Sequence, residues 1–184
     1  VSDKEEVYHS LIPEEIVKEL ALSKAENVAD DLREKQEQVK QISFDKKNNV
    51  LLDTIVIGAD TIVVSDGSIL GKPKDEADAV RMIRSLQGRS HKVYTGVAIL
   101  DYDDEGKRKS VVHAVETEVF VNPMSDEEIR EYAATGEPLD KAGAYGIQGQ
   151  FAAYIERIDG DYYNVVGLPV SYVYRQLKEI AEKD

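Results

Sequence analysis

The segment from Thr54 to Val64 constrains the fold most, because β-branched side chains occupy nearly all of it and a turn sequence, Ser65 to Ser68, follows. Such an apolar run favours a strand that is buried on both faces. Asp60 interrupts the run with a carboxylate, which is costly to desolvate unless a metal, a cation or several donors stabilise it. The sequence therefore predicts a partner opposite Asp60, either in a functional site or as a pairing that serves stability alone.

Helices and strands alternate along the rest of the chain. Helices are expected over about 13–30, over 75–86, over 125–136 and from Pro169 onward. The polar stretch 31–49 either continues the first helix or forms a loop. Gly88 closes the second helix, a capping box opens the third, and Val170, Val173, Leu177 and Ile180 face inward on the fourth. Strands are expected over 93–100 and 111–121, around the charged loop 101–109, and a hairpin over 155–166. This order predicts a mixed α/β fold in which a twisted sheet is flanked by helices.

Charge and composition exclude several classes of protein. With 36 acidic and 23 basic side chains, the net charge of −13 repels nucleic acid, so no nucleic-acid partner is expected. The absence of cysteine excludes disulfides, thiolate zinc sites and a cysteine nucleophile. Apolar runs fall short of the ~20 residues that span a bilayer, and no charged-then-apolar leader opens the chain. A cytoplasmic protein without a membrane partner is the expectation.

Three patterns are candidates for contact with a ligand. Lys24 lies on the apolar stripe of the first helix, four residues after Leu20, and either points into a site or extends its charge to solvent. Lys72 stands before a proline in Gly71–Lys74, where it either meets an anion or lies on the surface. The glycines from Gly143 to Gly149 permit positive φ and a close approach to a ligand, although irregular loops share this pattern.

Several motifs, taken in order, closely resemble those of the Maf family. They are Leu20-Ala-Leu-Ser-Lys24-Ala25, Gly58-Ala-Asp60-Thr61, Gly71-Lys72-Pro73, Thr95-Gly96-Val97, Gly136-Glu-Pro138, Asp140-Lys-Ala-Gly-Ala-Tyr-Gly-Ile-Gln-Gly149 and Val166-Gly-Leu-Pro169. The resemblance implies a fold like that of Maf and inosine triphosphate pyrophosphatases. It also implies hydrolysis of a nucleoside triphosphate to the monophosphate and pyrophosphate with a divalent metal, Mg²⁺ or Mn²⁺, with Co²⁺ as a third candidate.

The resemblance assigns roles to individual residues. It implies that Asp60 is the catalytic carboxylate and, with Glu6, a metal ligand. The expected phosphate-contacting cations are Lys24, Lys72 and Lys141. Thr61 and Gln148 fall where the family sets base preference, and their pattern is that of the dTTP/UTP subgroup. Whether Asp60 ligates the metal or takes a proton from water stays open.

The resemblance also bears on domain organisation and leaves two other functions open. We expect 1–184 to form a single Maf-like domain that lacks the family's N-terminal strand and S-x-S-P-R-R turn, because Val1 to Glu6 resembles the segment that follows them. The alternatives are a 7-methyl-GTP pyrophosphatase of the same family, and a nucleotide-binding regulator of cell division without turnover. A nucleoside triphosphate is the expected small-molecule partner, and a homodimer is a further expectation.

Overall fold

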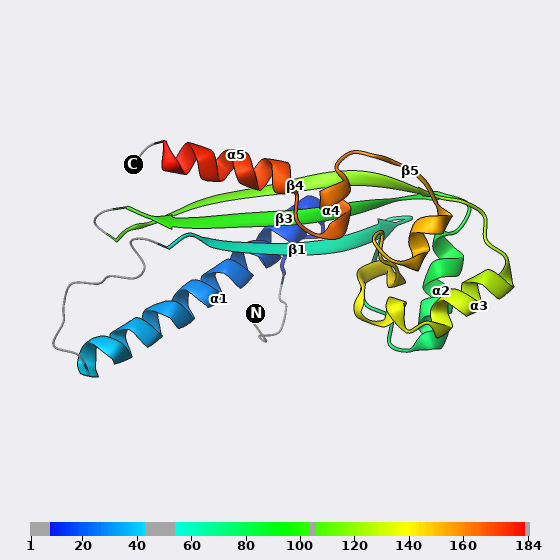
Figure 1. The fold of residues 1–184 in the computed structure, drawn as a ribbon, viewed down its shortest axis with the longest axis horizontal. Coiled ribbons are helices and arrows are strands. Elements are labelled where there is room, and N and C mark those ends of the chain that lie inside the picture. Colours follow the sequence, from blue (N-terminus) through cyan, green and yellow to red (C-terminus); the bar gives the residue numbers. More distant parts are fainter. Residues whose placement is uncertain (1–7, 43–53, 104–105, 183–184) are drawn as a thin grey trace. The chain divides into compact units, whose positions relative to one another are not determined.

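One five-stranded sheet with helices around it makes up the computed structural model, which describes residues 8–42, 54–103 and 106–182 (Figure 1). Over these residues the strands are β1 (Val56–Ser65), β2 (Ser68–Leu70), β3 (Ser90–Tyr102), β4 (Arg108–Val121) and β5 (Ile155–Asp159). The helices are α1 (Pro13–Ile42), α2 (Glu76–Leu86), α3 (Asp126–Ala134), α4 (Tyr162–Val166) and α5 (Val170–Ala181), with 3₁₀ turns η1 (Glu137–Asp140), η2 (Ala142–Ala144) and η3 (Gln150–Tyr154). The strand order is β2-β1-β3-β4-β5, and both edge strands pair antiparallel with their neighbours. The predicted α/β class is confirmed.

Internal contacts divide the described residues into two compact units. The first unit takes its residues from 1–60 and 96–114, and the second from 61–95 and 115–184. Strand β1 contributes residues up to Asp60 to the first unit and residues from Thr61 onward to the second. Within the described ranges, no helix is both long enough and apolar enough to cross a membrane.

In the first unit, α1 lies against the strands (Figure 1). Small side chains make up much of this contact. The buried core joins Ala21, Ala25 and Ala29 of the helix to Val56, Ala98 and Leu100 of the strands. A Cβ atom on Gly58 would lie 2.3 Å from the carbonyl oxygen of Ala21, and one on Gly96 would lie 2.0 Å from that of Val17. Glycine at these two strand positions therefore permits the helix backbone to lie directly on the sheet.

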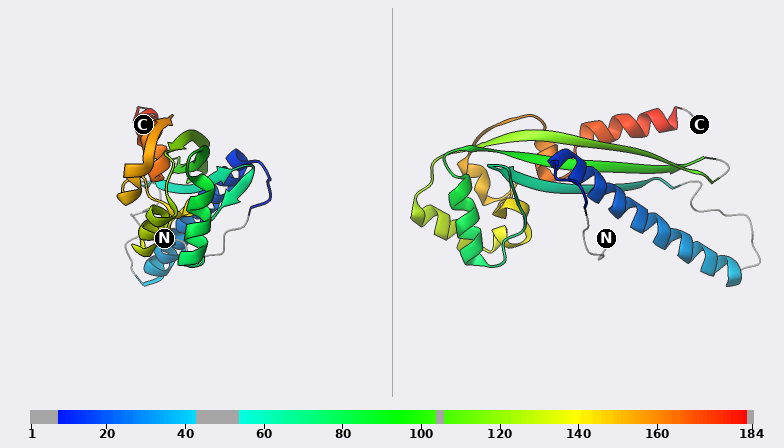
Figure 2. Two further views of the ribbon diagram at one scale, coloured as in Figure 1. Left: turned by 90° about the vertical axis from the view of Figure 1, so that its right-hand side faces the viewer. Right: turned by 180° about the vertical axis from the view of Figure 1, so that it is seen from behind.

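In the second unit, α2 and α3 lie side by side in Figures 1 and 2. They share a core that includes the fully buried Phe151. The Asp75 side chain caps α2 by accepting from the Asp78 amide at 2.8 Å. Ser125 and Glu128 form the capping box that opens α3. Left-handed glycines follow both helices, with φ of +68° at Gly88 and +76° at Gly136. These helix predictions are confirmed, because each rests on local signals at the helix ends.

The prediction that β1 is buried on both faces is wrong for its first half. Val56 is buried, whereas Ile55 and Ile57 on either side of it are 39% and 41% exposed. Successive side chains of a strand point to opposite faces, and Val56 and Gly58 belong to the face that contacts α1. The opposite face of this segment is only partly covered. The preceding helix also runs further than 30, because α1 continues through the polar stretch to Ile42.

The predicted hairpin over 155–166 is also wrong. Strand β5 ends at Asp159 and pairs with β4, while 162–166 form the short helix α4. Asp161 starts this helix by accepting from the Tyr163 amide at 2.8 Å, and Gly167 ends it with a φ of +117°. The buried Asn164 then donates to the Val93 carbonyl at 3.1 Å. Capping and a buried hydrogen bond thus override the β propensity of this segment.

The final helix begins after Pro169 as predicted, but its inward face differs from the prediction. Val173 is buried, and Leu177 and Ile180 are half-buried. Val170, which was expected to face inward, is 46% exposed. This residue occupies the first position of the helix.

Candidate functional site

Asp60 forms an ion pair with Lys24 inside the first unit. The Lys24 ammonium donates to Oδ1 of Asp60, whose side chain is only 11% exposed. The contact follows from the close approach of α1 to β1, because Gly58, on the same face of the strand as Asp60, lies against the backbone of Ala21 and Ala25. The partner that the sequence predicts for Asp60 is therefore Lys24. A nearly buried carboxylate beside an ammonium group is an arrangement that can bind a metal or a phosphate oxygen.

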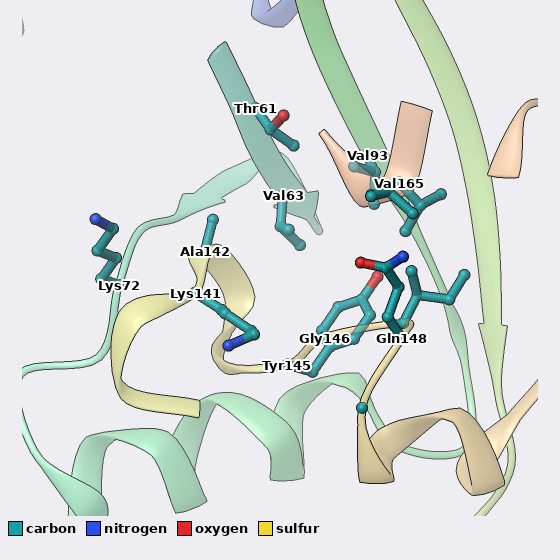
Figure 3. Close-up of a pocket in the computed structure, with 13 residues that line it drawn as sticks. Thr61, Val63, Lys72, Val93, Lys141, Ala142, Tyr145, Gly146, Gln148 and Val165 are labelled. Carbon is teal, nitrogen blue, oxygen red and sulfur yellow. The ribbon is translucent and has the colours of Figure 1, made fainter. Parts of the chain in front are cut away.

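A separate feature, in the second unit, is a cavity of about 280 Å³ (Figure 3). It is lined by Thr61, Val63, Lys72, Val93, Lys141, Ala142, Tyr145, Gly146, Ile147, Gln148, Gly149, Val165 and Val166. Four of the residues singled out by the sequence, Thr61, Lys72, Lys141 and Gln148, thus line one pocket. The glycine-rich segment 143–149 supplies much of its wall, with a φ of +69° at Gly143. The pocket offers a small apolar interior together with the Gln148 amide, the hydroxyls of Thr61 and Tyr145, and two lysine side chains.

The hydroxyl of Thr61 takes part in a chain of hydrogen bonds. Its oxygen lies 2.8 Å from the hydroxyl oxygen of Thr95, which donates to the carbonyl of Asn164 at 2.8 Å. Because a hydroxyl has a single proton, Thr95 must accept from Thr61. The proton of Thr61 is thereby committed, and this residue can offer a ligand only an acceptor.

The two lysines lie differently in the pocket. Lys141 turns toward Gly146, and its ammonium donates to the Asp140 carboxylate at 2.6 Å and to the Glu137 carbonyl at 3.1 Å (Figure 3). The hydrogen bond from Lys141 lowers the pKa of Asp140 below its ordinary value. Lys72 extends its side chain away from Lys141 in Figure 3 and is exposed. Their positive charge makes the pocket suitable for an anionic ligand despite the net charge of the chain.

Tyr145 and His91 form a buried pair behind the pocket that the sequence did not identify. The Tyr145 hydroxyl lies 2.7 Å from Nε2 of His91, and the two rings pack edge to face. Burial lowers the pKa of His91 to about 4, so the imidazole is neutral at pH 7. Tyr145 stands inside the predicted glycine segment, but no spacing rule connects it to a histidine 54 positions earlier. This pairing depends on tertiary structure alone.

Asp60 is the carboxylate through which the described residues could hold a metal. The second predicted ligand, Glu6, lies outside the described residues. Among the residues that the structure does describe, no three histidine, aspartate or glutamate side chains form a cluster suited to a metal ion.

Comparison with known proteins extends these observations to the whole chain. A family model described as Maf-like protein matches residues 1–180. A dTTP/UTP pyrophosphatase of Dictyoglomus turgidum is 47% identical over 86% of this chain and 70% of its own length. Proteins of the same name from Agathobacter rectalis and Carboxydothermus hydrogenoformans are 43% and 44% identical over 96% of this chain, and over 83% and 82% of their own lengths. The similarity therefore covers both units.

Proposed function

The chain belongs to the Maf-like protein family, and from that membership we propose that it is a nucleoside triphosphate pyrophosphatase that hydrolyses dTTP and UTP to the monophosphate and pyrophosphate. The observation that carries the proposal is the pocket of the second unit, where Gln148 and Thr61 accompany two lysines. The relatives named dTTP/UTP pyrophosphatase, at 43–47% identity, support the same activity.

The hydrogen-bonding groups of the pocket suit a pyrimidine with a carbonyl beside an N3–H. Uracil and thymine present both groups along one edge, and the primary amide of Gln148 offers the complementary donor and acceptor in one plane. Thr61 adds an acceptor, because its own proton is donated to Thr95. The apolar side chains of Val63, Val165 and others surround these groups. This combination supports the choice of dTTP and UTP over 7-methyl-GTP, whose base is larger and presents two adjacent donors.

Lysines supply the charge that a triphosphate requires. A chain with a net charge of −13 can bind such an anion only where cations reverse the field locally. Lys72 and Lys141 line the pocket and are the proposed contacts. Lys141 already holds the Asp140 carboxylate, so a phosphate oxygen would replace one anionic acceptor with another.

A divalent metal fits the donor chemistry of Asp60 and is part of the proposal. Carboxylate oxygen is the ligand that Mg²⁺ prefers, and one or two carboxylates with substrate phosphates commonly hold it. When bound, Mg²⁺, Mn²⁺ or Co²⁺ would polarise the attacked phosphate and neutralise charge on the leaving pyrophosphate. Asp60 would hold the metal, with Glu6 as the predicted second ligand, or accept the proton of the attacking water. Lys24, paired with Asp60, would offer its ammonium to a phosphate oxygen.

Release of pyrophosphate from dTTP, UTP and 7-methyl-GTP by the full-length protein, with each of the three metals, tests the proposal. We expect metal-dependent release that is fastest with dTTP and UTP. Nucleotide binding without release would favour the non-catalytic regulator, and faster turnover of 7-methyl-GTP would favour the other subgroup. A cytoplasmic location and a homodimer stay predictions that separate measurements must test.

Substitution of the proposed catalytic carboxylate gives a sharper test. Asp60→Asn keeps the side-chain volume but removes the negative charge that a metal or a proton requires. Loss of a general base typically slows turnover by about 10²- to 10⁴-fold, and we expect a loss in this range while nucleotide binding persists. Turnover above about a tenth of the wild-type rate would contradict the role of Asp60.

A further inference from the structure

The Glu137 carboxylate joins α3 to the pocket wall. One of its oxygens accepts from the Tyr132 hydroxyl at 2.9 Å, and the other accepts from the Gln150 amide at 3.0 Å. Gln150 follows directly after the glycine-rich segment that lines the pocket. The backbone of Gly146, at the other end of the Gly146–Gly149 segment, also interacts with the Tyr132 hydroxyl and partly offsets the rise in the pKa of Tyr132 that burial causes. Both ends of this segment are thus connected to one tyrosine–glutamate pair.

The backbone of the segment also lies in close contact with the side chains of Glu137 and Lys141. A Cβ on Gly149 would lie 2.0 Å from a carboxylate oxygen of Glu137, so the backbone of Gly149 rests directly on this group. A Cβ on Gly146 would lie 2.8 Å from Cε of Lys141. The ammonium of the same lysine donates to the backbone carbonyl of Glu137 at 3.1 Å. Glu137 therefore contacts the Lys141 ammonium directly through its backbone carbonyl. Its carboxylate contacts Gly149, the residue that follows Gln148.

We propose that Glu137 is a positioning residue that holds the Gly146–Gly149 segment against α3 and thereby sets the base selectivity exerted by Gln148. The inference rests on the proposed pyrophosphatase function. Gln148 is exposed and lies in the Gly146–Gly149 turn, which the Gly149 amide closes by donating to the Gly146 carbonyl at 3.1 Å. The contacts with Glu137 would fix this turn relative to α3, and with it the direction of the Gln148 amide. A misplaced amide would lose its discrimination between bases while the lysines still bound phosphate.

Three variants separate this role from general stability. Glu137→Ala removes both acceptors, whereas Glu137→Gln keeps the volume and can accept from the Gln150 amide while donating to the Tyr132 oxygen. Tyr132→Phe removes a single hydroxyl and is the milder variant if Glu137→Ala does not fold. The matched control is Glu128→Ala, which breaks the capping box of α3, the helix that carries Tyr132, and does not alter a residue of the pocket wall.

The measurement is kcat/KM for UTP and for GTP with each variant, together with hydrogen exchange of the Gln150 amide. For Glu137→Ala we expect the UTP-to-GTP ratio to fall at least about tenfold, as expected when a polar group of the site loses its partner, and the Gln150 amide to exchange faster. Tyr132→Phe should shift both in the same direction, and Glu137→Gln should restore the ratio to within about threefold of wild type. Glu128→Ala should lower the melting temperature without changing the ratio.

Two outcomes would overturn the inference. An unchanged Gln150 exchange rate in Glu137→Ala would show that the carboxylate does not hold the segment. An unchanged UTP-to-GTP ratio alongside faster exchange would show that the segment does not set base choice. Neither result depends on the proposed activity failing, because that failure appears separately as an absence of pyrophosphate release by the wild-type protein.

Discussion

Gly96→Ala tests the close approach of α1 to the sheet in the first unit. A Cβ at this position would lie 2.0 Å from the Val17 carbonyl oxygen, 2.3 Å from its carbon and 2.9 Å from the Lys18 nitrogen. All three atoms belong to the helix backbone, so no side-chain rotation can remove the collision. The helix must move away from β3 at this point, or the strand must deform.

The size of the effect follows from the distance. Real Cβ contacts are essentially never closer than 3.0 Å, so the backbone must retreat by about 1 Å, the difference between 3.0 and 2.0 Å. Overpacking in a core typically costs about 1–3 kcal/mol, and we expect the upper end because backbone atoms take the strain. At about 2–4 °C per kcal/mol for a chain of this size, the melting temperature should fall by about 6–12 °C.

Thermal unfolding and urea titration of Gly96→Ala measure this loss directly. Gly71→Ala is the matched control, because a Cβ on Gly71 meets no atom within 4 Å and its φ lies outside the left-handed region. This control should be neutral or slightly stabilising. Because Lys24 and Asp60 meet across the same helix–strand contact, Gly96→Ala should also slow pyrophosphate release. A loss of stability below about 0.5 kcal/mol would refute the close packing.

Two further predictions concern Gln148 of the pocket wall and the buried His91. Gln148→Glu should lower kcat/KM for dTTP and UTP by at least about tenfold, since a mismatched polar group costs about 1–3 kcal/mol. The preference for these substrates over 7-methyl-GTP should narrow or reverse. A uniform loss on all three substrates would mean that Gln148 supports the pocket wall without reading the base. His91, whose pKa falls from 6.5 to about 4 in the folded state, should contribute stability that is complete above pH 6.5 and is lost as the pH falls to 4, because only the unfolded state takes up the proton in that window. Over these 2.5 pH units the free energy of unfolding falls by up to about 3 kcal/mol. Denaturant titrations at several pH values should show a shallower fall of this free energy for His91→Gln than for the wild type. Equal slopes for the two proteins would contradict the prediction.

Local signals accounted for the parts of the fold that were predicted correctly. The helix over 75–86 and the capping box at Ser125 are defined by residues within one turn of each other, so sequence spacing suffices to recognise them. Lys24 could likewise be singled out, because a charged residue broke an otherwise apolar helical stripe. In each case the information lies within a few consecutive residues.

Tertiary contacts explain what sequence reasoning missed. The residues 162–166 themselves favour a strand, and the helix is specified by the caps Asp161 and Gly167. It is specified further by the contacts of Asn164 with Val93 and Thr117, far away in the chain. The pairing of His91 with Tyr145 and the exposure of Ile57 likewise depend on which elements become neighbours. Glu137 belongs to the motif Gly136-Glu-Pro138, yet the spacing of the sequence does not reveal that its carboxylate accepts hydrogen bonds from Tyr132 and Gln150.

The least conspicuous residues determine the most specific contact of the first unit. Alanine and glycine carry no chemistry, but Ala21 and Ala25 on α1 and Gly58 on β1 decide how closely the two backbones approach. A larger residue at any of these positions would move α1 outward, and the Lys24 ammonium would then lie farther from Asp60. Asp60 would then lose its close contact with the ammonium while its side chain stays nearly buried, and weakening a buried ion pair in this way is costly. The geometry of the ion pair is therefore a property of the small residues that surround it as much as of its two charged members.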